Sequence, residues 1–220
     1  MSSNRRVFVT DFDGTMTDVD FYTLVKSQLL PANQHDYWDD YRAGKLTHFE
    51  ALKAYFSAIR NSEREVLKLL AEMKLDPQAR ESIATLTEHN WKVVIASAGC
   101  DWYISNLLAE AGIEVEVHAN PGYFVPNQGL LMELPTSSPF CSHEHGIHKA
   151  GIVKHYLNSG SVVAFAGDGF PDVDAALLVP AHLRFARRDL ASELTSRKEG
   201  FRNFDHWSEI VHYLTAMEPQ

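Results

Sequence analysis

Two aspartates stand two residues apart directly after an apolar run, in the segment VFVTDFDGTMT at positions 7–17. Neighbouring carboxylates repel each other, and a divalent cation relieves that repulsion. Oxygen ligands without a nearby cysteine or histidine suit Mg²⁺ better than zinc. A second acidic pair follows another apolar run, in AGDGFPDVDAA. The sequence therefore predicts a Mg²⁺ site formed by Asp11, Asp13, Asp168 and Asp172.

A carboxylate beside such a metal can attack phosphorus and form an aspartyl phosphate. The first aspartate, Asp11, is the predicted nucleophile. Asp13 is the predicted general acid and base, which protonates the departing alcohol and later deprotonates the attacking water. Gly14 allows the backbone to turn sharply at this point.

The elements that must position these residues are short apolar runs separated by helical patterns. Helical periodicity is found at 83–89, 102–111, 148–157 and 172–178, and the five strand-like runs are RVFVTDF, WKVVIASAG, IEVEVHA, SVVAFAGDG and AHLRFAR. Runs without polar alternation are typical of parallel strands that helices cover on both faces. The alternation of strand-like runs with helical segments along the chain predicts an α/β fold with a doubly wound parallel sheet. Ligands of such sheets bind at the carboxyl ends of the strands.

The stretch 18–81 is too long for a single crossover and shows helical periodicity. Phe49, Leu52, Phe56 and Ile59 recur at helical spacing, as do Val66, Leu67, Leu70 and Met73 after the candidate N-cap Ser62. We expect an inserted helical cap domain at 18–81 and a core domain at 1–17 and 82–220. Periodicity alone also permits extra helices on the sheet edge.

Four segments of the chain resemble the motifs of haloacid dehalogenase superfamily phosphatases. The segments are DFDGTMT, IASAG, HKAGIVKHY and GDGFPD, in the order that this family shows. The resemblance implies a Rossmann-like core and a helical cap that closes over the substrate. It also implies that Ser97, with Ala98 beside it, binds the transferring phosphoryl group, and that Lys149 neutralises phosphate and nucleophile. Helix capping by Ser97, and Lys154 in place of Lys149, are the alternatives.

The cap and the C-terminal half look like the phosphoserine-phosphatase-type branch, and within it most like the ketose-phosphate phosphatases of methionine salvage. The resemblance implies hydrolysis of a small-molecule phosphate monoester. Phosphoserine, phosphoethanolamine or phosphocholine hydrolysis, and a non-catalytic phosphate-binding protein, are the alternatives. Near the hinge of the cap, Asp18, Asp20 and Tyr22 are candidate substrate contacts. Of these, Asp20 is the one that we predict to bind the substrate. The segment PGYFVPNQGLLMELPTSSPF is treated as a connecting loop.

Composition excludes several classes of partner. The chain of 220 residues has a formal net charge of −9, which disfavours nucleic acid and anionic membrane surfaces. The segment MSSNRR lacks the apolar run of a secretory signal, and two cysteines cannot form a disulfide framework. We expect a cytoplasmic protein without nucleic-acid or membrane partners.

The segment CSHEHGIHK is a possible transition-metal site. It contains Cys141, His143, His145 and His148, whose spacing matches no paired zinc pattern. We expect solvated histidines in a loop here rather than zinc ligands.

Overall fold

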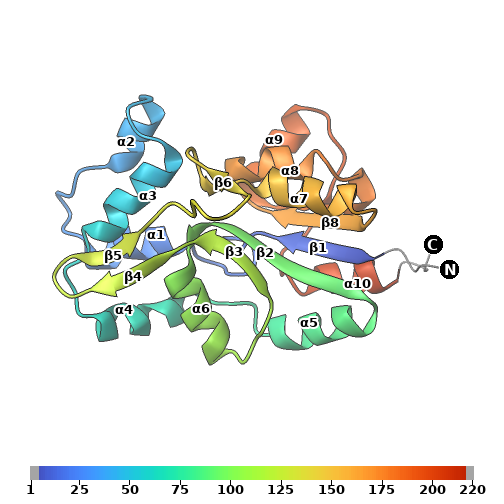
Figure 1. Ribbon diagram of the computed structural model, residues 1–220, viewed down its shortest axis with the longest axis horizontal. Coiled ribbons are helices and arrows are strands. Elements are labelled where there is room, and N and C mark those ends of the chain that lie inside the picture. Colours follow the sequence, from blue (N-terminus) through green and yellow to red (C-terminus); the bar gives the residue numbers. More distant parts are fainter. Residues whose placement is uncertain (1–4, 217–220) are drawn as a thin grey trace.

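A six-stranded parallel sheet forms the centre of the protein in the computed structural model, which describes residues 5–216 (Figure 1). Its strands are β1 (Arg6–Thr10), β2 (Trp91–Cys100), β3 (Glu116–Asn120), β8 (Val162–Gly167), β9 (Arg184–Ala186) and β10 (Arg202–Asn203). They lie in the order β10-β9-β8-β1-β2-β3, and every pair is parallel. The strand β1 is therefore central, and its carboxyl end lies between those of β2 and β8.

Helices cover both faces of this sheet (Figure 1). One face carries α7 (Lys149–Asn158), α8 (Val173–Ala176) and α9 (Arg188–Ser196), and the other carries α5 (Ala79–Glu88), α6 (Asp101–Glu110) and α10 (Glu209–Thr215). Because side chains alternate along a strand, Val7 and Val9 pack on the first face and Phe8 on the second. Short 3₁₀ segments, η3 (Phe170–Asp172) and η4 (Ala181–Leu183), join β8 to β9.

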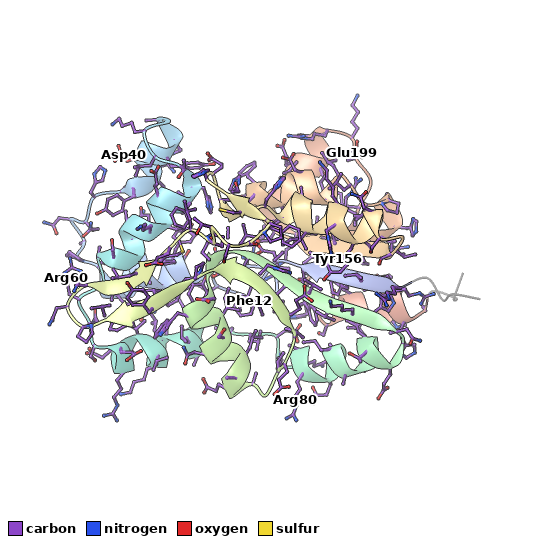
Figure 2. All side chains as sticks on the ribbon, viewed as in Figure 1. Phe12, Asp40, Arg60, Arg80, Tyr156 and Glu199 are labelled. Atoms are coloured by element: carbon purple, nitrogen blue, oxygen red, sulfur yellow. The ribbon has the colours of Figure 1, made fainter. Side chains whose placement is uncertain are left out.

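The predicted doubly wound α/β fold is confirmed, and each of the five predicted strand runs contributes a strand to the sheet. The two-residue β10 was not predicted, because Arg202 and Asn203 are both exposed and show no apolar pattern. Figure 2 shows Phe12, the fully buried residue between the two aspartates, near the middle of the molecule.

Between β1 and α5 the chain forms a helical insertion. It contains α1 (Phe21–Leu24), the π-helical η1 (Val25–Leu29), α2 (Tyr37–Arg42), α3 (His48–Ser57), α4 (Glu63–Leu70) and η2 (Ala71–Met73). The two connections to the core meet in an antiparallel bridge between Thr17 and Leu75. The division into core and cap at 18–81 remains a prediction, and positions 1–4 and 217–220 lie outside the described residues.

The segment treated as a loop contains an antiparallel hairpin, so that prediction was wrong. Strands β4 (Gly122–Val125) and β5 (Gly129–Met132) pair and lie beside α3 (Figure 1). Gly129 has a φ of +84°, and a Cβ there would lie 2.5 Å from the Phe56 carbonyl oxygen. Only glycine combines that backbone conformation with this close approach. A second small hairpin joins β6 (Cys141–Ser142) to β7 (Gly146–Ile147).

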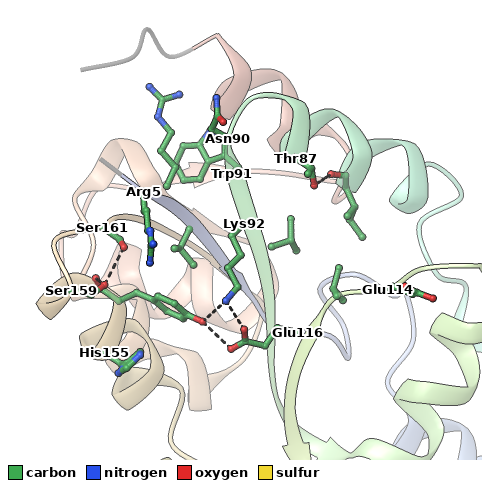
Figure 3. Close-up of a pocket in the computed structure, with 16 residues that line it drawn as sticks. Arg5, Thr87, Asn90, Trp91, Lys92, Glu114, Glu116, His155, Ser159 and Ser161 are labelled. Atoms are coloured by element: carbon green, nitrogen blue, oxygen red, sulfur yellow. Dashed lines mark hydrogen bonds and ion pairs between the residues drawn. The ribbon is translucent and has the colours of Figure 1, made fainter. Parts of the chain in front are cut away.

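A cavity of about 610 Å³ opens at the amino ends of β1, β2 and β3 (Figure 3). Lys92 and Tyr156 both bind Glu116 there, at 2.5 and 2.8 Å. This cavity lies at the edge of the sheet opposite to the predicted site residues, and its central charges pair with each other. Within residues 5–216, no helix is both long enough and apolar enough to cross a bilayer.

Candidate active site

A cavity of about 560 Å³ lies at the carboxyl ends of the central strands, between the core and the helical insertion. The residues predicted for catalysis, phosphate and metal binding line it, together with Asp20: Asp11, Asp13, Ser97, Ala98, Lys149, Asp168 and Asp172. The first two follow β1, the serine and alanine lie near the end of β2, the lysine begins α7, and the last two follow β8. The parallel strands therefore bring together residues that are up to 161 positions apart in the sequence, Asp11 to Asp172.

Three carboxylates form a cluster suited to a cation. One oxygen each from Asp11, Asp168 and Asp172 lies within 4.8 Å of the others. The backbone N–H groups of Asp168 and Gly169 donate to Oδ2 of Asp172, at 3.1 and 3.0 Å. These hydrogen bonds fix the turn after β8, so that the acidic side chains converge.

The side chain of Lys149 is buried between two of these carboxylates. Its Nζ lies 2.8 Å from Oδ1 of Asp11 and 2.6 Å from Oδ1 of Asp172. Burial by itself lowers the pKa of Lys149, but the two carboxylates outweigh that effect and raise it. The alternative, Lys154, is exposed on the same helix. The geometry therefore favours Lys149 as the cation of the site.

The pKa of Asp11 is raised well above its usual value, because burial dominates while Lys149 opposes it. Oδ1 of Asp11 accepts the Phe12 backbone N–H at 2.7 Å in addition to the lysine. Oδ2 of Asp11 has no hydrogen-bond donor among the described residues.

The carboxylate of Asp13 is turned away from the acidic cluster. Its Oδ1 accepts the Phe21 backbone N–H at 2.9 Å, and its Oδ2 accepts the Tyr103 hydroxyl at 2.6 Å. Burial, followed by the nearby charge of Asp20, raises the pKa of Asp13 to about 6. The structure thus places Asp13 on the cavity wall but does not bring its side chain into the group of three carboxylates.

Ser97 is buried at the end of β2, and its Oγ accepts the Gly99 backbone N–H at 3.0 Å. Because Oγ is the acceptor in this bond, the hydroxyl proton is free to donate into the cavity. Ala98 is held by its carbonyl, which accepts Nδ2 of Asn120 at 2.7 Å. No side-chain cap by Ser97 is present at the start of α6, where Cys100 is the N-cap residue.

The donor set fits Mg²⁺ because it offers only carboxylate oxygens in a close cluster. Burial and then Asp172 raise the pKa of Asp168 to about 7, so the cluster is strained electrostatically without a cation. Gly14 has a φ of +68°, and a Cβ there would lie 2.2 Å from Oδ2 of Asp168. A side chain at position 14 would therefore collide with the Asp168 carboxylate.

A guanidinium group also reaches the acidic cluster. Nη1 of Arg188 lies 3.3 Å from Oδ2 of Asp168, and Nη2 donates to the Asp18 carbonyl at 2.5 Å. The Arg188 side chain therefore links the turn after β8 to the start of the helical insertion. Sequence reasoning missed this residue, because a surface arginine in RFARRD has no local pattern that marks it.

The helical insertion contributes a separate set of residues to the lining of the cavity. The insertion contributes one charged residue to the lining, Asp20, and six uncharged ones: Tyr22, Trp38, Tyr41, His48, Leu52 and Phe56. Nε1 of Trp38 and Nδ1 of His48 are buried and have no hydrogen-bond partner among the described residues. Burial, and then His145, lowers the pKa of His48 to about 3, so its ring is neutral.

Of the three candidate substrate contacts predicted near the hinge, two line the cavity and one does not. Tyr22 and Asp20 line the cavity, and burial raises the pKa of Asp20. Asp18 is exposed and does not line it. Sequence reasoning missed Trp38, Tyr41 and His48. For Trp38 and Tyr41 the aromatic segment HDYWDDYR was the available signal, but it does not indicate which side chains face the cavity, and His48 lies outside it.

The four residues of CSHEHGIHK lie on or beside the small hairpin β6–β7. Cys141 is in β6, His143 is exposed, and His148 is the N-cap residue of α7. The ring of His145 packs 5.3 Å from that of His48. The group of carboxylates described above includes none of these four residues.

Comparison with known proteins gives a family and a set of relatives. The model of the haloacid dehalogenase-like hydrolase family matches residues 8–177. A 2-hydroxy-3-keto-5-methylthiopentenyl-1-phosphate phosphatase of Microcystis aeruginosa is 26% identical over 210 residues, 95% of this chain and 97% of that protein. One of the same name from Bacillus pumilus is 23% identical over 194 residues, 86% of this chain and 82% of that protein.

Solved structures share the fold at low sequence identity. A haloacid dehalogenase family hydrolase from Salmonella enterica superimposes with a TM-score of 0.71 at 16% identity, covering 98% of this chain and 73% of that chain. A phosphoserine phosphatase from T. onnurineus superimposes with a TM-score of 0.65 at 18% identity, covering 98% of this chain and 96% of that chain.

Proposed function

The chain belongs to the haloacid dehalogenase-like hydrolase family, and we propose that it is a Mg²⁺-dependent phosphatase that acts through an aspartyl phosphate. The observation that carries this proposal is the contact of one buried lysine, Lys149, with Asp11 and Asp172, beside the cluster of three carboxylates. Such a site can hold a phosphoryl group next to a nucleophile while its charges are balanced.

In the first step, the carboxylate of Asp11 forms a bond to phosphorus, and the bond from phosphorus to the ester oxygen breaks. Asp13 transfers its proton to that oxygen, so the leaving group departs as an alcohol. In the second step, water attacks phosphorus and releases Asp11, while Asp13 accepts a proton from the water. Lys149 and the Ser97 hydroxyl contact the phosphoryl oxygens.

In this proposal Asp11, Asp168 and Asp172 would hold Mg²⁺, since one oxygen of each lies within 4.8 Å of the others. When bound there, the ion supplies positive charge that neutralises the carboxylates and the phosphoryl oxygens. The carboxylate of Asp13 is excluded from this proposed set, because Phe21 and Tyr103 hold it elsewhere.

We propose as substrate the 2-hydroxy-3-keto-5-methylthiopentenyl-1-phosphate for which the relatives are named. The wall formed by α2 and α3 supports an uncharged leaving group, since its cavity-lining side chains are aromatic, aliphatic or neutral histidine. A thioether packs well against aromatic rings.

Phosphoserine is a second candidate, because solved structures that share the fold carry that name. Its ammonium and carboxylate groups would each need a partner of opposite charge where they lose water on binding. The helices α2 and α3 contribute no charged side chain to the lining of the cavity. Phosphocholine is a weaker alternative that aromatic rings accommodate through cation–π contacts.

The test is phosphate release from these three monoesters and phosphoethanolamine by the intact protein, in Mg²⁺ and in EDTA. Asp11→Asn removes the nucleophile, and Asp174→Asn on the exposed side of α8 is the matched control. We expect Mg²⁺-dependent turnover, highest on the ketose phosphate, that Asp11→Asn abolishes and Asp174→Asn retains.

Full turnover by Asp11→Asn would refute the aspartyl-phosphate mechanism. Higher kcat/KM on phosphoserine or phosphocholine would refute the proposed substrate and leave the mechanism standing. A folded protein that binds inorganic phosphate but hydrolyses none of the esters would identify a phosphate-binding protein instead.

A further inference from the structure

Both oxygens of the Asp13 carboxylate are held by hydrogen-bond donors. The Phe21 backbone N–H binds Oδ1 from the side of the helical insertion, and the Tyr103 hydroxyl binds Oδ2 from the side of the core, at 2.6 Å. Two donors on different oxygens fix the plane of a carboxylate, which one donor alone does not. The orientation of Asp13 therefore depends on Tyr103.

Gly99 makes this contact possible. A Cβ at position 99 would lie 1.7 Å from the hydroxyl oxygen of Tyr103 and 3.0 Å from Oδ2 of Asp13. The backbone of Gly99 does not have a positive φ, so conformational freedom is not the reason for a glycine here. The absence of a side chain at Gly99 leaves room beside the end of β2 for the Tyr103 hydroxyl, which reaches Asp13 there.

The ring of Tyr103 is itself held firmly. It is buried in the first turn of α6 and packs against Phe21 at 4.3 Å and Phe56 at 6.0 Å between ring centroids. Burial, and then Asp13, raises the pKa of Tyr103 well above its usual value, so the phenol keeps its proton and remains a donor. Phe21 binds Asp13 through its backbone and Tyr103 through its ring, so the three residues form one unit.

We propose that Tyr103 is a positioning residue for proton transfer: it orients the Asp13 carboxyl group toward the oxygen of the leaving group. This inference rests on the proposed role of Asp13 as general acid and base. The proton moves from Asp13 to the ester oxygen as the bond from phosphorus to that oxygen breaks, and Tyr103 keeps its own proton throughout. Tyr103 does not contact the reacting atoms in this scheme.

The dependence of rate on the leaving group tests this role. Tyr103→Phe removes the hydroxyl and keeps the ring that packs on Phe21. An alkyl leaving group needs a proton to depart, whereas p-nitrophenolate does not. We expect alcohol release in the first turnover to fall about 10- to 100-fold for an alkyl phosphate, part of the 10²- to 10⁴-fold that general acid catalysis contributes. We expect less than about a threefold loss for p-nitrophenyl phosphate, with inhibition by inorganic phosphate unchanged.

Tyr156→Phe is the matched control. It also removes a tyrosine hydroxyl from a carboxylate, that of Glu116 at 2.8 Å, at the opposite edge of the sheet. We expect it to retain the wild-type ratio of the two first-turnover rates. In an Asp13→Asn background, Tyr103→Phe should cause no further loss, because the group that it orients is gone.

An equal loss on both phosphates by Tyr103→Phe, or no loss on either, would overturn the inference. A loss on both that accompanies a lower melting temperature would mean a structural role only. These results are separate from a failure of the proposed function, which full turnover by Asp11→Asn would reveal.

Discussion

At the scale of single residues, Lys149 reduces the electrostatic repulsion between the buried carboxylates of the site. It contacts Asp11 and Asp172 at once, and its side chain is only 4% exposed. A buried cation between two carboxylates offsets their repulsion and their loss of hydration, but each member then depends on the others. Removing the lysine leaves buried charges without a partner.

Lys149→Met therefore tests the site at this scale. We expect turnover to fall at least about 10²-fold, because one group that neutralises the phosphoryl oxygens is lost. We also expect the free energy of unfolding to fall by about 3 kcal/mol, as for other broken buried ion pairs. Steady-state kinetics and urea unfolding measure the two effects. Lys154→Met, on the exposed side of the same helix, is the control, and equal behaviour of the two variants would contradict the assignment.

At the scale of elements, helix α3 links the insertion to the core. Thr47 and Glu50 cap its start reciprocally, with the Glu50 N–H donating to Oγ1 of Thr47 at 3.1 Å and the Thr47 N–H donating to the Glu50 carboxylate at 2.8 Å. The two residues between them contact the hairpin β6–β7: the Phe49 N–H donates to the Glu144 carbonyl at 2.9 Å, and His48 packs on His145.

His48 gives this contact a pH dependence. Burial lowers its pKa from 6.5 to about 3 in the folded protein, with His145 and Lys149 adding to the effect. Between these two pH values the unfolded chain binds a proton that the folded protein does not, so acidification favours unfolding. The stability that a neutral His48 provides is complete above pH 6.5 and is lost as the pH falls toward 3.

His48→Asn removes this titration. We expect the free energy of unfolding to decrease less between pH 7 and pH 4.5 in this variant than in the wild type, as measured by urea unfolding at each pH. The exposed His143→Asn is the matched control. A pH dependence of His48→Asn that coincides with the wild-type curve would show that His48 is not buried in a neutral form.

At the scale of the whole molecule, two buried aspartates of the cavity, Asp13 and Asp168, have the opposite effect to His48 on the pH dependence of stability in the absence of metal. Burial raises the pKa of Asp13 to about 6 and that of Asp168 to about 7, so the folded protein holds protons that the unfolded chain releases from about pH 4 upward. The contribution of these two groups to the free energy of unfolding therefore decreases as the pH rises from about 4 to 7. A cation bound by the cluster would compensate for this loss.

Mg²⁺ is therefore expected to stabilise the folded protein most above pH 7. At a concentration of 100 times its Kd, it should add about 2.7 kcal/mol to the free energy of unfolding, since it binds only the folded state. Thermal unfolding at pH 8 with Mg²⁺ or EDTA measures this effect. We expect Asp168→Asn to reduce the shift and Asp174→Asn to retain it. A wild-type melting temperature that Mg²⁺ does not change would exclude the proposed site.

The sequence predicted the parts of this protein that depend on local patterns. Apolar runs indicated the strands, and the aspartates of VFVTDFDGTMT and GDGFPD stood directly after two of them. Because parallel strands present their carboxyl ends at one edge, the position of Asp11 near Asp168 followed from topology alone. The hairpin of β4 and β5 escaped prediction, since its segment carries prolines and glycines that usually mark loops.

The sequence by itself thus determined the α/β class, the edge of the sheet that carries the site, and the chemical types of its core residues. Only the tertiary structure decided which side chains complete the site. Tyr103 reaches Asp13 across 90 positions because Gly99 leaves room for its hydroxyl. Trp38 and His48 face the cavity because α2 and α3 pack over it. Periodicity describes one element at a time, whereas these contacts depend on how separate elements pack against each other.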